Sequence, residues 1–89
     1  MVKCSFPDGH YCSEAQVWVV LPVQERKKSH WNDNLVVGHP GFDGVEFQVA
    51  KGSQKILALY PNTDEIGVVA SDLEDLVRKW KMDSIDYPF

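Results

Sequence analysis

The sequence has few of the residues from which metal sites and nucleophilic active sites are usually built. Its 89 residues include two cysteines and three histidines. The spacing of Cys4, His10 and Cys12 differs from zinc signatures, in which one close cysteine pair is followed by a second close pair. The glycine-rich patterns GxGxxG and GxxxxGKS/T, which bind nucleotide phosphates, do not occur. We therefore expect no catalytic residue, no metal site and no cofactor.

The two cysteines leave several alternatives open. Two reduced, half-buried thiols are the simplest prediction. A Cys4–Cys12 disulfide would require the two segments to pair face to face. A zinc site would need His30 or His39 as a further ligand, and a nucleophile–base pair would need a histidine beside Cys12.

Long hydrophobic runs are also missing. The longest run, residues 17–23, is interrupted by Pro22 and falls far below the ~20 residues that a membrane span requires. The N-terminus lacks the charged and then apolar pattern of a secretory signal. We expect a soluble, cytoplasmic protein that does not associate with a membrane.

Positive charge is scarce in the C-terminal third of the chain. Residues 1–55 carry six basic and six acidic side chains, whereas residues 56–89 carry three basic and seven acidic ones. The net charge of −4 therefore comes from the C-terminal region. A nucleic acid needs a basic surface, and the chain offers only the short run Arg26-Lys27-Lys28. We expect no nucleic-acid partner, and an acidic surface that would attract a basic protein.

The residues that are present predict one small α+β domain covering residues 1–89. Hydrophobic residues make up 44% of the chain, which is enough for a core. Alternating apolar residues, separated by turn signals, predict an antiparallel sheet of five to six strands. The expected strands span residues 1–6, 16–23, 35–37, 45–49, 56–60 and 66–70. Residues 24–34 are polar and are expected to form a loop with room for one helical turn.

A C-terminal helix over residues 71–82 is the clearest expected element. Ser71 and Glu74 have the spacing of a capping box, in which Ser71 would be the N-cap. An apolar stripe at helical spacing would pack on one face of the sheet; it comprises Leu73, Leu76, Val77 and Trp80. Tyr87 and Phe89 follow the helix and are expected to fold back on the domain or on a partner subunit.

One helix can cover only one face of such a sheet. The second face is expected to carry the apolar residues Trp18, Val20, Leu57 and Leu59. A curled sheet, the loop of residues 24–34 or a second copy of the chain could cover them. Of these alternatives we favour a homodimer.

Two segments together resemble the C-terminal half of the SMI1/KNR4 family, also called the SUKH superfamily. They are LVVGHPGFDGVEF at residues 35–47 and EIGVVASDLEDLV at residues 65–77. Like that family, the chain has a strand leading into a Gly/Asp-rich turn, then a hairpin, a short strand and an acidic helix start, over residues 35–82. The resemblance implies a binding module similar to bacterial immunity proteins, which neutralise toxin domains and have no catalytic residues.

The sequence thus predicts a non-enzymatic protein-interaction module, with a toxin domain as one kind of partner. Trp31 lies in a polar loop, where it either covers the open sheet face or marks a binding surface, because Trp is enriched at interface hot spots. The predicted partner-binding residues are Trp31, His39, Phe42, Asp43 and Glu46. The alternative is a small ligand-binding domain or enzyme with a pocket near the turn of residues 38–46.

Overall fold

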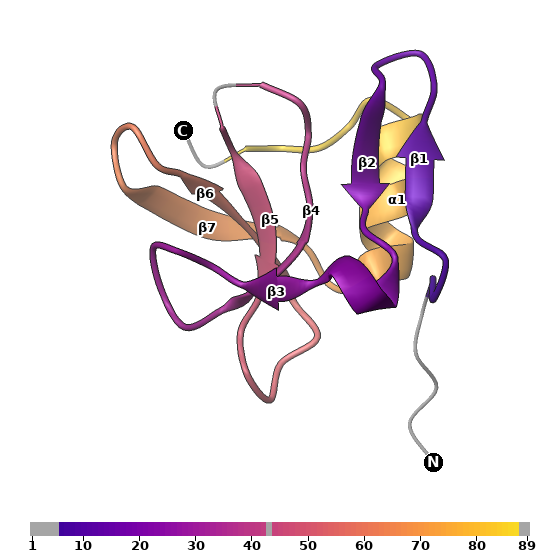
Figure 1. Cartoon of the computed structure of the whole chain (residues 1–89). Coiled ribbons are helices and arrows are strands. Elements are labelled where there is room, and N and C mark those ends of the chain that lie inside the picture. The colour runs from indigo at the N-terminus through magenta and orange to yellow at the C-terminus, as the bar shows by residue number, and fades with distance from the viewer. Residues whose placement is uncertain (1–5, 43, 88–89) are drawn as a thin grey trace.

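The structure is a computed structural model that describes residues 6–42 and 44–87 (Figure 1). Its elements are β1 (His10–Cys12), β2 (Val17–Val20), the 3₁₀ turn η1 (Val23–Glu25), β3 (Lys27–Lys28), β4 (Leu35–Gly38), β5 (Glu46–Val49), β6 (Ile56–Tyr60), β7 (Glu65–Ala70) and α1 (Leu73–Lys81). An antiparallel sheet has the order β3-β4-β5-β6-β7, and β1 and β2 form a separate two-stranded sheet. The predicted α+β class, with one C-terminal helix, is confirmed. The strand expected over residues 1–6 falls outside the described residues except for Phe6.

The strands β4 to β7 lie where the sequence predicts them, because each is a short, largely apolar or alternating segment bounded by turn residues. Phe47 of β5 pairs with Ala58 of β6, and both are fully buried. Ile56 and Val37 lie in the same core cluster. Full burial of a side chain such as Phe47 contributes roughly 1.5–3 kcal/mol. The helices in the described part of the chain are too short and too polar to cross a membrane.

The segment expected to be a central strand of the sheet, residues 16–23, is instead β2 of the small sheet. It is paired with β1 and crosses β4, to which two backbone hydrogen bonds join it. Leu21 N–H donates to Val37 O at 2.7 Å, and His39 N–H donates to Trp18 O at 2.9 Å. β1 and β3 were not expected as strands, since both are very short and consist largely of polar residues.

Three β-bulges shape this arrangement. The register shifts leave one extra residue in each of three strands, namely Val19 in β2, Val37 in β4 and Val69 in β7. A bulge bends its strand and changes the direction of neighbouring side chains. Val20 therefore lies in the core with Val19, and the expectation that it would be on the outer face of the main sheet is wrong. Trp18 is also absent from that face and packs edge-on against Tyr11, with ring centroids 5.2 Å apart.

The helix α1 begins one residue later than the sequence predicts. Its N-cap is Asp72, whose Oδ1 accepts the backbone N–H of Asp75 at 2.8 Å. Asp75 Oδ2 in turn accepts the backbone N–H of Ser71 at 2.9 Å. The predicted Ser71–Glu74 capping box is thus wrong: Asp72 caps the helix, and Asp75 rather than Glu74 bonds back to Ser71. Figure 1 shows α1 beside the β1–β2 hairpin, and the helix contacts both β2 and β7.

Candidate functional site

A buried glutamine organises the face of the main sheet that points away from the core. Gln48 is fully buried, although it occupies an outward position of β5. Its Oε1 accepts hydrogen bonds from Asn32 Nδ2 at 2.9 Å and Asn34 Nδ2 at 3.1 Å. Its Nε2 donates to Ser29 Oγ at 3.1 Å and to Glu46 Oε1 at 2.9 Å. The loop between β3 and β4 is thereby fixed over β5.

Trp31 is presented from this fixed loop. Its backbone N–H donates to Ser29 Oγ at 3.1 Å, and Ser29 Oγ donates to Glu46 Oε1 at 2.9 Å. The Trp31 side chain is nevertheless 59% exposed. Because only its backbone takes part in the hydrogen bonds, the indole is held on the surface without being needed for the network. The structure thus brings together two of the predicted binding residues, Trp31 and Glu46.

Next to this loop the same face is aliphatic. Cross-strand pairing defines the outer sheet face by Val36, Glu46, Gln48, Leu57, Leu59, Ile66 and Val68. Ile66 is 45% and Val68 is 55% exposed, whereas Leu59 is buried. The turn before β7 adds the acidic residue Asp64, whereas Glu65, the first residue of β7, alternates with Ile66 and belongs to the opposite face. The outer sheet face therefore combines an exposed Trp, exposed aliphatic side chains and carboxylates.

The other predicted residues are not linked to this face by any described hydrogen bond. His39 Nδ1 lies 3.4 Å from Val45 O. Phe42 packs edge-on against Tyr87 with ring centroids 5.3 Å apart, and Tyr87 stacks on the core residue Phe47 at 6.4 Å. Tyr87 thus folds back on its own domain, which is one of the two expected outcomes. Asp43 lies outside the described residues, so its part in the predicted site has no structural description.

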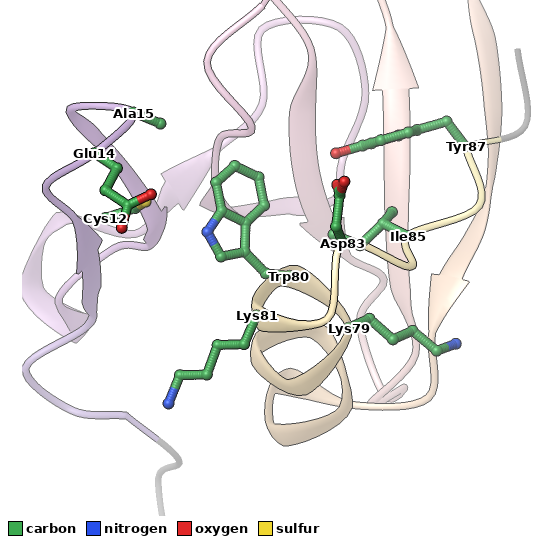
Figure 2. Close-up of a pocket in the computed structure, with 9 residues that line it drawn as sticks. All are labelled: Cys12, Glu14, Ala15, Lys79, Trp80, Lys81, Asp83, Ile85 and Tyr87. Carbon is green, nitrogen blue, oxygen red and sulfur yellow. The ribbon is translucent and has the colours of Figure 1, made fainter.

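A cavity of about 440 Å³ lies between the β1–β2 turn, the end of α1 and the C-terminal segment (Figure 2). Figure 2 shows the Trp80 indole in its centre, with the indole nitrogen turned towards Cys12 and Glu14. Lys79 and Lys81 contribute cationic side chains to its lining. The sequence did not indicate this cavity, because two stretches that are distant in the chain, residues 12–15 and 79–87, form it.

Two groups that line this cavity have shifted pKa values. The backbone N–H of Ala15 and a hydrogen bond from the Trp80 side chain lower the pKa of the Cys12 thiol, against the opposing effects of burial and of the Glu14 carboxylate. Burial, assisted by the charge of Asp83, raises the pKa of Tyr87 to about 12. Cys12 is therefore more easily ionised than an ordinary thiol, and Tyr87 is protonated at neutral pH.

The described side chains do not assemble a recognisable catalytic or metal centre. Among them, no group of three or more His, Cys, Asp and Glu residues is placed to hold a metal ion. Cys12 is a free thiol, and Cys4 lies outside the described residues. His10 and Cys12 line a neighbouring cavity of about 350 Å³, but no described hydrogen bond joins them as a nucleophile and its base.

Comparisons with known proteins give no relative from which a role could be transferred. Protein-family models, curated protein sequences and solved structures were each compared with this chain, and none of them matches it.

Proposed function

We propose that this chain is a non-enzymatic protein-interaction module that binds a basic protein partner through the outer sheet face. The observation that carries the proposal is Trp31, which is 59% exposed on a loop fixed by hydrogen bonds. The indole of Trp31 offers a partner a large, rigid apolar surface. Tryptophan is also the residue type most enriched among the dominant contacts of protein interfaces.

The hydrogen bonds beneath Trp31 support this role. Gln48 is buried with its amide oxygen and nitrogen both bonded, so the loop has little freedom to rearrange. A binding group that is already held in place loses less conformational entropy when a partner arrives. The loop therefore suits recognition better than it suits core packing, in which Trp31 would be covered.

The charge of this region favours a basic partner. Glu46 lies on the outer sheet face, and Asp64 lies in the turn at its β7 end. The whole chain carries a net charge of −4. Complementary charge raises association rates and suppresses the binding of acidic competitors.

The resemblance of residues 35–82 to the SMI1/KNR4 family leads to the more specific part of the proposal. We propose an immunity-like protein, whose partner is a basic toxin domain such as a nuclease. We further propose that the protein acts in the cytoplasm and that it forms a homodimer, for which the exposed Ile66 and Val68 of the outer sheet face provide apolar surface.

The test is direct binding to a panel of purified basic nuclease-toxin domains by calorimetry. At least one domain should bind the wild-type chain, and Trp31→Ala should weaken that binding about 30-fold, as expected for a hot spot of about 2 kcal/mol. Met82→Ala is the matched control, because Met82 is 69% exposed and lies at the end of α1. Equal affinities of wild type and Trp31→Ala would show that Trp31 is not the anchor, and binding to no member of the panel would remove the toxin-domain proposal.

A further inference from the structure

The main sheet ends in an open edge along β7. β7 is last in the strand order and pairs only with β6. Within the described backbone, residues 65–68 make no hydrogen bond outside that pairing. The N–H and C=O groups of such an edge are available to another strand. The opposite edge is β3, which has two residues, both lysines, whereas β7 has six residues and contains neither lysine nor proline.

The side chains beside this edge are suited to a further strand. Ile66 and Val68 are both exposed on the outer sheet face, at 45% and 55%. They flank Gly67, which has no side chain. Isolated exposed aliphatic residues are ordinary, but these two lie together on an unpaired edge.

The two ends of β7 differ in charge. Asp64 and Glu65 stand at its start. At its end, Lys79 Nζ lies 3.3 Å from the carbonyl oxygen of the bulged residue Val69. Lys55 lines the same groove, a cavity of about 360 Å³ beside the end of β7.

Two carboxylates also line that groove. Asp75 is already paired with Arg78 and with Lys79, whose Nζ is 3.4 Å from Asp75 Oδ2. Asp86 is the second carboxylate of the groove. Lys55 and Lys79 are thus balanced by Asp75 and Asp86 in the lining of the groove, whereas the start of β7 has two carboxylates and no lysine.

We propose that β7 pairs with β7 of a second copy of this chain, antiparallel about a two-fold axis at Gly67. This inference deepens the proposed homodimer and rests on it. The pairing places Ile66 opposite Val68 of the partner subunit, so that the exposed aliphatic side chains cover one another on one face. It also places Glu65 opposite Val69 of the partner subunit, next to that subunit's Lys79.

The charges favour this orientation of the two strands. Antiparallel pairing brings the acidic start of each β7 to the lysines at the end of the other, whereas parallel pairing would set the two acidic starts side by side. A shift of one residue would put the aliphatic side chains on opposite faces, so the aliphatic contact also fixes the register. An interface of this kind is self-complementary, as a two-fold axis requires.

The β7 edge is separate from the Trp31 loop. The loop is bonded to β5, and β6 lies between β5 and β7. A substitution on the β7 edge can therefore abolish dimerisation without changing binding through Trp31. A substitution of Trp31 can likewise abolish partner binding without changing dimerisation.

Sedimentation equilibrium of the full chain tests the interface. The wild type should show twice the 10.1 kDa mass of one chain. Val68→Lys, which sets two charges against each other near the axis, should reduce the mass to that of one chain. Val23→Lys is the matched control, because Val23 is 45% exposed on the turn η1, and it should stay dimeric, as should Trp31→Ala.

Exchanging the charges of Glu65 and Lys79 gives a second, independent test of the interface. Glu65→Lys and Lys79→Glu should each weaken self-association at least tenfold, and an equimolar mixture of the two variants should associate again. Circular dichroism would confirm that each variant is folded. A wild type that is monomeric at all concentrations would overturn both the homodimer and this interface. A dimer that persists in Val68→Lys, or no recovery in the mixture of folded variants, would overturn the β7 interface alone.

Discussion

Gly38 and Val19 lie where β4 and β2 cross, and the two backbones touch. A Cβ atom at Gly38 would lie 1.8 Å from the carbonyl oxygen of Val19. The hydrogen bond from His39 N–H to Trp18 O, one residue to either side, holds the strands at this distance. This contact joins the small β1–β2 sheet to the main sheet. It requires glycine at position 38, because a side chain there would collide with the Val19 carbonyl.

Gly38→Ala is expected to destabilise the domain by about 3 kcal/mol or more, at the upper end of the cost of overpacking, because backbone cannot move aside as a side chain can. In a domain of this size that corresponds to a fall in Tm of roughly 12–24 °C. Gly52→Asn is the control, since nothing lies within 4 Å of a Cβ at Gly52 and asparagine tolerates its positive φ. Thermal unfolding followed by circular dichroism measures both, and a Tm for Gly38→Ala within about 4 °C of the wild type would contradict the crossing.

The sequence predicts those parts of the fold that are determined locally. β5 alternates apolar and polar residues, β6 is a short apolar run between turns, and the apolar stripe of α1 repeats at helical spacing, so their presence follows from the chain itself. β2 is also a short apolar run, but it lies in the small sheet and not in the main sheet. The bulge at Val19 turns both Val19 and Val20 into the core. Pairing partners and bulges depend on the rest of the fold, and no local pattern reveals them.

The candidate site likewise contains one residue that the sequence points to and one that it does not. Trp31 is conspicuous in the sequence because its neighbours are polar. Gln48 is not, because a glutamine that alternates with Phe47 and Val49 is expected to face water. It is fully buried only because Asn32 and Asn34, from a distant part of the chain, cover it and bond to it.

The start of α1 provides a test that separates the observed cap from the predicted one. Asp72→Ala removes the side chain that accepts the Asp75 N–H, and should cost about 1 kcal/mol of the free energy of unfolding. Ser71→Ala removes only a longer hydroxyl contact to Asp75, and Glu74→Ala removes no described capping bond. Urea unfolding should therefore rank Asp72→Ala as the least stable of the three, with Asp72→Asn close to wild type. A larger loss in Ser71→Ala would return the N-cap to Ser71.

The lowered pKa of Cys12 predicts how its alkylation depends on pH. The N–H groups of Ala15 and Trp80 stabilise the thiolate, so Cys12 should ionise at a lower pH in the folded protein than in the unfolded chain. In a Cys4→Ser background, the rate of reaction with iodoacetamide should rise with a midpoint below that measured in urea.

The Trp80 hydrogen bond is the part of this effect that can be removed. Trp80→Phe keeps an aromatic ring beside Cys12 but has no N–H to donate, so the midpoint should move up towards the value of the unfolded chain. Lys81→Gln is the control, because Lys81 lines the same cavity and has no part in lowering the pKa of Cys12. If Lys81→Gln moves the midpoint as far as Trp80→Phe does, the charge of the cavity rather than the indole hydrogen bond stabilises the thiolate.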